Sequence, residues 1–151
     1  MQKFHNPTFR SVVLSLVLVF SALSTHAESV KNAVKPGNGK VTTLPSGVMV
    51  ETKVVGKGVK PNAGSVVKVH YRGTLENGNE FDSSYKRGEP ATFPLNRVIP
   101  CWTQGVAMMA VGGKAILTCP AETAYGERGA GASVPPNSRL IFEVELLDIL
   151  K

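Results

Sequence analysis

The feature that most constrains the fold is the C-terminal segment, where a loop rich in glycine and proline leads into an alternating apolar sequence. The loop opens at Tyr125 and closes at Pro135 and Pro136. Residues 139–149 then place apolar side chains at every second position, including Leu140 and Phe142. A period of two is typical of a strand with one face buried. We therefore predict a long C-terminal strand that follows a structured loop.

Further strand patterns precede this segment. They cover residues 48–55, 66–71, 81–83, 92–95 and 114–119, with an Asn-Gly hairpin turn at 77–78 and a loop at 85–90. One helix is predicted from Pro100, because Trp102, Val106 and Met109 repeat at helical spacing, and we expect it to end at Gly112-Gly113. The sequence thus predicts an α+β fold in which an antiparallel five-stranded sheet wraps around one short helix.

The N-terminal residues have the pattern of an export signal. Lys3 and Arg10 precede an apolar run at 12–23, and small residues follow up to Ala27. The run is shorter than the roughly 20 residues that span a bilayer, so we predict a cleavable signal peptide over 1–27 rather than a membrane anchor. The expected destination is the periplasm, with secretion as the alternative. Residues 28–43 are polar and predict a flexible arm, and 44–151 form the expected domain.

Charge and motifs exclude several classes of function. Without Lys3 and Arg10, the 17 basic residues fall to 15 against 11 acidic ones, a net of +4, and the charges are scattered. Nucleic-acid binding therefore has little support. His70 is the only histidine after residue 27, and no protease, phosphate-loop or CxxC motif is present. We expect no metal, since two cysteines and one distant histidine give too few ligands.

Aromatic and aliphatic residues recur next to predicted turns. They could simply form the core, or they could line an apolar pocket in which Asp82 and Tyr125 supply polar groups. Their motifs are Val-His-Tyr ending at Tyr71, Phe-Asp-Ser-Ser from Phe81, Val-Ile-Pro-Cys-Trp at 98–102, and Ala-Tyr-Gly at 124–126. Together with the final strand, they resemble the FKBP-type (macrolide-binding) peptidyl-prolyl cis–trans isomerases, especially exported and Mip-type bacterial members. The resemblance covers about 44–151 and departs from the family at Ala91, Ala130 and Cys101.

The resemblance implies a set of site residues. It assigns catalysis to Tyr71, Asp82, Tyr125 and Phe142, and substrate binding to Phe81, Phe93, Val98, Ile99, Trp102 and Val134. Trp102 would form the pocket floor, the Ile99 N–H would bind a carbonyl on the C-terminal side of proline, and Val134 would form an aliphatic lip. Asp82 would face the twisted carbonyl, order Tyr71, or cap the turn at 83–84.

The implied function is an exported prolyl isomerase that acts on proline-containing polypeptides without a cofactor. Macrolides such as rapamycin are expected ligands, and the expected oligomeric state is a monomer. The alternative is a holdase chaperone or proline-binding module that uses the same pocket without catalysis. The resemblance also places the helix entrance and the following strand close together beneath the pocket, which implies a Cys101–Cys119 disulfide. Two buried free thiols are the alternative.

Overall fold

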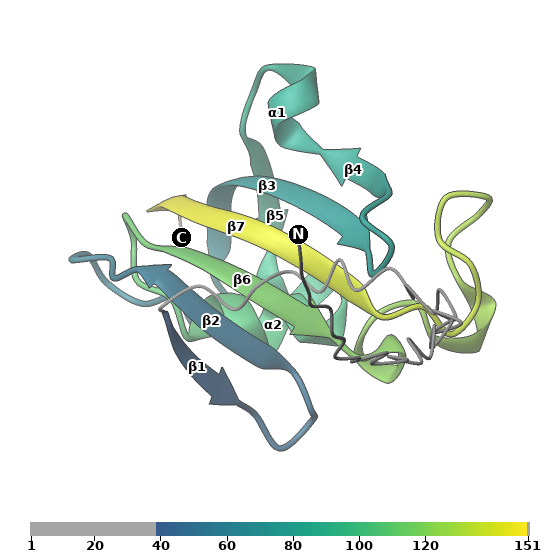
Figure 1. The fold of residues 1–151 in the computed structure, drawn as a ribbon. Coiled ribbons are helices and arrows are strands. Elements are labelled where there is room, and N and C mark those ends of the chain that lie inside the picture. The colour runs from purple at the N-terminus through teal and green to yellow at the C-terminus, as the bar shows by residue number, and fades with distance from the viewer. Residues whose placement is uncertain (1–38, 151) are drawn as a thin grey trace, which may run out of the picture. The chain divides into compact units, whose positions relative to one another are not determined.

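The computed structural model describes residues 39–150, and the predicted signal peptide lies outside the described residues. The described part forms a seven-stranded antiparallel sheet in the order β1-β2-β6-β7-β3-β4, with β5 also paired to β3 (Figure 1). The strands are β1 (Lys40–Thr43), β2 (Met49–Val54), β3 (Val66–Leu75), β4 (Glu80–Ser83), β5 (Ala91–Pro94), β6 (Lys114–Cys119) and β7 (Leu140–Ile149). The predicted α+β class is confirmed, but the sheet has seven strands rather than five.

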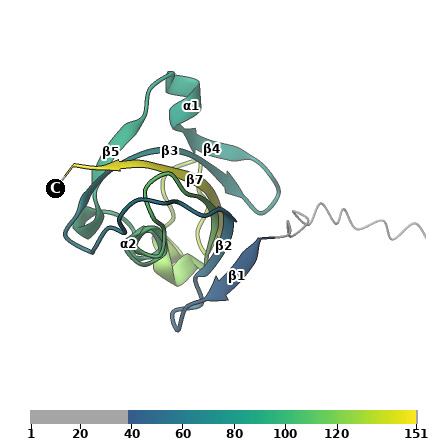
Figure 2. The same cartoon turned by 90° about the vertical axis from the view of Figure 1, so that its left-hand side faces the viewer.

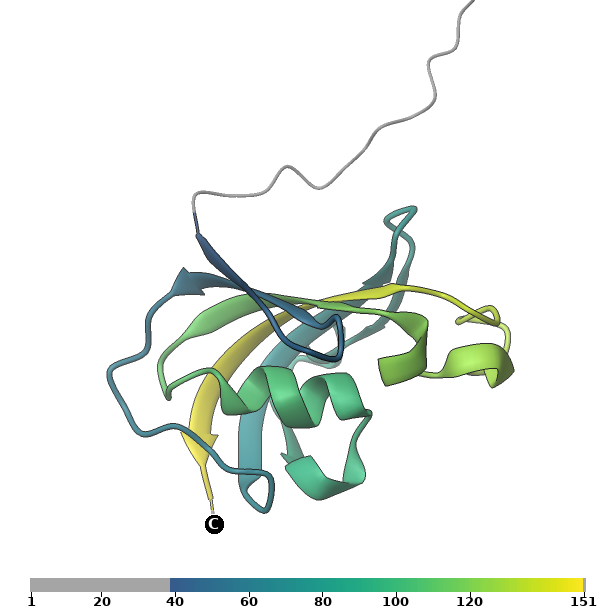
Figure 3. The same ribbon diagram turned by 90° about the horizontal axis from the view of Figure 1, so that it is seen from below.

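The helices are short. They are α1 (Ser84–Arg87) and α2 (Pro100–Ala107), with single 3-10 turns η1 (Leu95–Arg97), η2 (Ala121–Thr123) and η3 (Gly126–Arg128). The sheet curves around α2, which lies against its concave face (Figures 2 and 3). Within residues 39–150, no helix is long and apolar enough to cross a membrane. That same part of the protein has no cluster of three or more histidine, cysteine or acidic residues able to hold a metal ion.

The core lies between α2 and the concave face of the sheet. Alternate residues of the two longest strands point into it, namely Val67, Val69 and Tyr71 of β3 and Leu140, Phe142, Val144 and Leu146 of β7, all buried. Trp102 and Val106 of α2 pack from the other side. A Cβ on Gly105 would lie 2.9 Å from the Leu117 side chain, so the glycine lets α2 approach β6 closely.

Three local expectations are wrong. Helix α2 ends at Ala107 rather than at Gly112-Gly113, and Gly112 instead occupies a left-handed position (φ 86°) in the turn before β6. Residues 85–87 are not loop but part of α1, because the Ser83 side chain accepts the Lys86 N–H and caps one helical turn. The predicted end of the flexible arm at residue 43 lies too far along the chain, because Lys40–Thr43 forms strand β1 and pairs with β2.

The two cysteines form the expected disulfide. The Cα atoms of Cys101 and Cys119 are 5.6 Å apart, and both side chains are fully buried. The bond ties the first turn of α2 to the end of β6 and lies next to Trp102 in the sequence. It therefore fixes the helix against the sheet at the level of the concave core.

Candidate active site

One cavity of about 470 Å³ opens at the concave face of the sheet. Its walls come from segments far apart in the sequence, and they are mainly aromatic and aliphatic. The lining residues are Tyr71, Phe81, Asp82, Phe93, Arg97, Val98, Ile99, Trp102, Tyr125 and Phe142. Its volume and its apolar walls with a few polar groups are typical of a site for a small molecule or a short peptide segment.

Trp102 is the centre of the aromatic wall. Its ring is nearly perpendicular to three others, with centroid distances of 5.2 Å to Tyr71, 5.5 Å to Phe93 and 5.4 Å to Phe142. Phe81 extends the wall and packs perpendicular to Phe142 at 5.6 Å. Perpendicular packing is a favourable arrangement for aromatic rings, so each ring holds its neighbours in place. The result is a rigid apolar surface.

A glycine makes room for this surface. Gly73 occupies the next inward position of β3 after Tyr71, and a Cβ there would lie 2.6 Å from the Phe81 ring and 2.9 Å from the Phe142 ring. Any side chain at this position would displace both rings. Gly73 therefore shapes the cavity, although nothing in the sequence pattern had singled it out.

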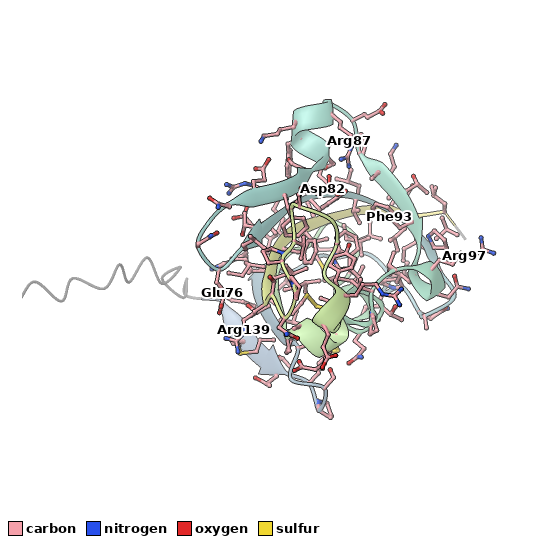
Figure 4. The ribbon with its side chains drawn as sticks, turned by 90° about the vertical axis from the view of Figure 1, so that its right-hand side faces the viewer. Glu76, Asp82, Arg87, Phe93, Arg97 and Arg139 are labelled. Atoms are coloured by element: carbon pink, nitrogen blue, oxygen red, sulfur yellow. A yellow bond between two sulfur atoms is a disulfide. The ribbon has the colours of Figure 1, made fainter. Side chains whose placement is uncertain are left out.

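A polar edge borders the aromatic wall. The Tyr71 hydroxyl donates to Asp82 Oδ2 at 2.5 Å and accepts from Arg87 Nη2 at 2.9 Å. Arg87 Nη1 also donates to Asp82 Oδ1 at 2.6 Å, so the three side chains form a closed triangle. Figure 4 shows Arg87 beside Asp82, the acidic residue that lines the cavity. The Tyr71–Asp82 contact is the one that the ordering alternative requires, and the side chain that caps the following turn is that of Ser83 rather than Asp82.

Burial and hydrogen bonds set the protonation states of the side chains along this polar edge. Partial burial raises the pKa of Asp82, but hydrogen bonds from Tyr71 and Arg87 outweigh it, so the net pKa lies below the ordinary value. Burial, followed by the hydrogen bond to Asp82, raises the pKa of Tyr71. Burial and the Asp82 charge likewise raise the pKa of Tyr125. At neutral pH the carboxylate is therefore ionised and both phenols keep their protons.

Besides the buried Trp102 indole N–H and the Arg97 side chain, a backbone N–H and a hydroxyl of the cavity have no acceptor among residues 39–150. One is the backbone N–H of Ile99, the residue before helix α2, whose carbonyl accepts from Trp102 and Thr103. The other is the hydroxyl of Tyr125, whose side chain lies partly exposed at the mouth of the loop. Both residues line the cavity, so both donors are available to a bound carbonyl.

Nine of the ten site residues expected from the sequence line this cavity. Their roles in catalysis and binding stay a prediction. Val134 is the exception, because it does not line the cavity: its backbone pairs with Ala130, and its side chain is buried in the hydrophobic core. Sequence reasoning missed Arg97, which lines the cavity, and Arg87, which holds Asp82 and Tyr71. Neither arginine lies in a motif, and only their proximity in the fold brings them to the site.

Comparison with known proteins identifies the fold and its family. Residues 57–147 match the profile of the family described as FKBP-type peptidyl-prolyl cis-trans isomerase. The chain is 54% identical over 120 residues to the FkpA isomerase of Aeromonas hydrophila, a match covering 80% of this chain and 43% of the relative. It is 52% identical over 128 residues to the FKBP-type 22 kDa isomerase of Escherichia coli K12, a match that covers 82% of this chain and 61% of the relative.

Solved structures agree with this comparison. The crystal structure of FkpA from Escherichia coli superposes with a TM-score of 0.71 at 47% identity, over 75% of this chain and 52% of that one. The crystal structure of AtFKBP13 gives a TM-score of 0.68 at 42% identity, and the match covers 73% of this chain and 98% of that one. The chain spans less than two thirds of the length of the curated relatives named above. On the match of its sequence and its fold, the chain belongs to the FKBP-type peptidyl-prolyl cis-trans isomerase family.

Proposed function

We propose that this protein is a peptidyl-prolyl cis–trans isomerase that accelerates rotation about X-Pro bonds in polypeptides. The observation that carries the proposal is the cavity itself, in which a rigid aromatic wall stands beside the free hydrogen-bond donors of Ile99 and Tyr125. Family membership supports the same activity. An X-Pro bond rotates slowly because the amide has partial double-bond character, with a barrier of about 18–20 kcal/mol.

The aromatic wall lowers this barrier by excluding water. A planar amide is more dipolar than the twisted one, because twisting removes the resonance that places negative charge on the oxygen. An apolar cavity therefore destabilises the planar ground state more than the twisted transition state. Trp102, Phe93 and Phe142 would surround the prolyl ring. No nucleophile is needed, since no bond is broken.

The free donors would orient the substrate. The Ile99 N–H would bind the carbonyl on the C-terminal side of proline, and the Tyr125 hydroxyl would donate to a second carbonyl. Asp82 acts as a positioning residue, because its two oxygens hold Tyr71 and Arg87. In this division of roles, the aromatic wall lowers the barrier to rotation, and the polar groups align the substrate.

A protease-coupled or NMR exchange assay on a short X-Pro peptide tests the proposal. We expect the protein to accelerate cis–trans exchange and rapamycin to suppress that acceleration by filling the cavity. If exchange stays at the uncatalysed rate while rapamycin or the peptide still binds, the cavity belongs to a binding module rather than an enzyme.

We also propose that the protein is exported and acts as a monomer. The apolar run at 12–23 and the disulfide both fit a compartment in which disulfides persist. Fractionation of cells that express the protein, with N-terminal sequencing, tests the export and the expected cleavage after Ala27. Sedimentation at several protein concentrations tests the monomer.

A further inference from the structure

Arg97 is a charged residue of the cavity to which the proposed mechanism gives no role. It lines the cavity, its side chain is exposed, and it takes part in none of the ion pairs found among residues 39–150. Arg87, by contrast, is paired with Asp82. In Figure 4, Arg97 lies apart from both of these residues, beyond Phe93. The cavity thus carries one guanidinium that is free to meet a substrate.

The backbone of Arg97 is held in place. Arg97 ends the 3-10 turn η1, whose first residue, Leu95, is fully buried. The Leu95 N–H donates to the Ser65 carbonyl at 2.9 Å, and the Thr103 hydroxyl donates to the Leu95 carbonyl at 2.6 Å. These bonds tie η1 to the residue before β3 and to α2, so the Arg97 side chain extends from a fixed backbone position beside the cavity.

The surroundings of Arg97 favour an anion. Helix α2 begins three residues further on, with no acidic side chain in its first turn and no side-chain cap on its N-terminus. The positive end of the helix dipole therefore lies at Ile99 and Pro100, two to three residues from Arg97, and both Ile99 and Arg97 line the cavity. Among residues 39–150, Asp82 is the only carboxylate that lines the cavity, and it is paired with Arg87. This side of the site carries uncompensated positive charge.

We propose that Arg97 is a specificity-determining residue that favours substrates with an acidic residue on the C-terminal side of proline. The inference rests on the proposed function, in which the Ile99 N–H, two residues from Arg97, holds the carbonyl on that side of proline. A guanidinium binds a carboxylate through two parallel hydrogen bonds, which an amide of the same shape does not match. Because the pair would be exposed, we expect a preference of about two- to fivefold that weakens as salt rises.

Matched peptides test this preference. One set shares the same X-Pro pair and carries Glu, Gln or Lys at the first or the second position after proline. NMR exchange gives kcat/KM for each peptide at low and high salt. Quenching of Trp102, the only tryptophan of the protein, gives the Kd independently of turnover. We expect the Glu peptide to exceed the Gln peptide, and the Lys peptide to rank last.

Substitutions identify the residue responsible. We expect Arg97→Gln to bring the Glu-to-Gln ratio close to one, Arg97→Lys to keep part of it, and Arg97→Glu to reverse it. Arg139→Gln is the control, because it removes the same charge from an exposed arginine that pairs with Glu76 and does not line the cavity. That variant should keep the ratio of the parent protein.

Two results would overturn the inference: a Glu-to-Gln ratio of one in the parent protein, or a ratio that Arg97→Gln leaves unchanged. If no peptide is accelerated at all, the isomerase proposal fails, and the Kd ratios from Trp102 quenching still decide whether Arg97 selects acidic peptides. The two failures are therefore distinguishable.

Discussion

The two faces of the central sheet differ sharply, although the same strands form both. On β3, Val69 and Tyr71 point to the concave face, whereas His70 and Arg72 point to the convex one. The concave side carries the aromatic wall around Trp102. The convex side carries ion pairs, such as Lys114 with Glu145 at 3.2 Å, and His70 stacked on Tyr85 at 4.7 Å.

The difference shows where binding energy can be concentrated. Exposed ion pairs typically contribute about 0.2–1 kcal/mol each, since water screens them and ordering the side chains costs entropy. A rigid apolar wall acts by excluding water from the bound substrate, so solvent does not screen its effect. We therefore expect changes on the concave face to alter both stability and isomerisation, and changes on the convex face to alter neither by much. Four substitution experiments, ordered from the largest expected effect to the smallest, test this contrast.

Phe142→Ala should have the largest effect. Phe142 is buried in the aromatic wall, and truncating a buried Phe to Ala typically costs about 3–5 kcal/mol in unfolding free energy. Rehydration of the bound amide should also lower kcat/KM at least about tenfold, equivalent to about 1.4 kcal/mol in the barrier. Urea unfolding and NMR exchange measure the two effects.

The neighbouring residue on β7 provides the control. Glu143→Ala, on the convex face, should leave both quantities nearly unchanged. Trp102→Leu keeps an apolar floor and should lower activity less than Phe142→Ala does. A Phe142→Ala protein that folds and keeps the parent rate would refute the desolvation mechanism.

Replacing both cysteines by alanine should have the second-largest effect on stability and activity. The disulfide closes a loop with 17 residues between the cysteines, one fewer than their sequence separation of 18, and a loop of this size contributes about 3 kcal/mol in the chain-entropy model. Because Cys101 precedes Trp102, isomerisation should fall as well when the helix start loosens. Thermal unfolding with and without dithiothreitol measures the effect. The double variant should not respond to the reductant, and a parent protein equally stable in both conditions would show that the bond contributes nothing.

Asp82→Asn should have a smaller effect. The amide can still accept from Tyr71, but it loses the charge that holds Arg87. Hydrogen bonds to charged groups contribute about 1.5–3 kcal/mol, and the exposure of Asp82 reduces this, so we expect a rate loss of about tenfold or less. Abolished turnover in a folded Asp82→Asn protein would show that Asp82 takes part in chemistry directly.

The contacts of Asp82 also make the stability of the protein depend on pH. The pKa of Asp82 is lower in the folded protein than in the unfolded state, so the Asp82 contribution to stability is present above the ordinary value of about 3.9. It is lost as pH falls through the folded-state pKa. Stability measured from pH 7 to pH 2 should therefore fall less steeply at the acid end in Asp82→Asn than in the parent protein.

Lys114→Gln on the convex face should have the smallest effect. It removes one exposed ion pair with Glu145, and such changes usually stay within about 0.5 kcal/mol. Unfolding free energy and kcat/KM should both match the parent protein. A large loss of activity in this variant would break the contrast between the faces and indicate that the convex surface also serves the function.

Much of this fold could be predicted from the sequence because its main signals are local. The period of two along residues 139–149 and the helical spacing of Trp102 and Val106 depend on neighbours a few residues apart. These signals predicted β7, the position of α2 and the buried face of each. Element ends were less predictable. Helix α2 stops at Ala107, and Lys40–Thr43 joins the sheet, because packing and strand pairing decide where an element ends.

The amino-acid sequence by itself determined the alternation of buried and exposed positions and the ordered motifs that identify the family. Only the tertiary structure decided which side chains meet across long separations. Arg87 closes its triangle with Asp82 and Tyr71, and Gly73 makes room for two rings. Arg97 lines the cavity and joins no ion pair found among residues 39–150, whereas Val134 is buried in the core. The physical reason is that patterns along the sequence report which face of an element is buried. Contacts between elements depend on how those faces pack together.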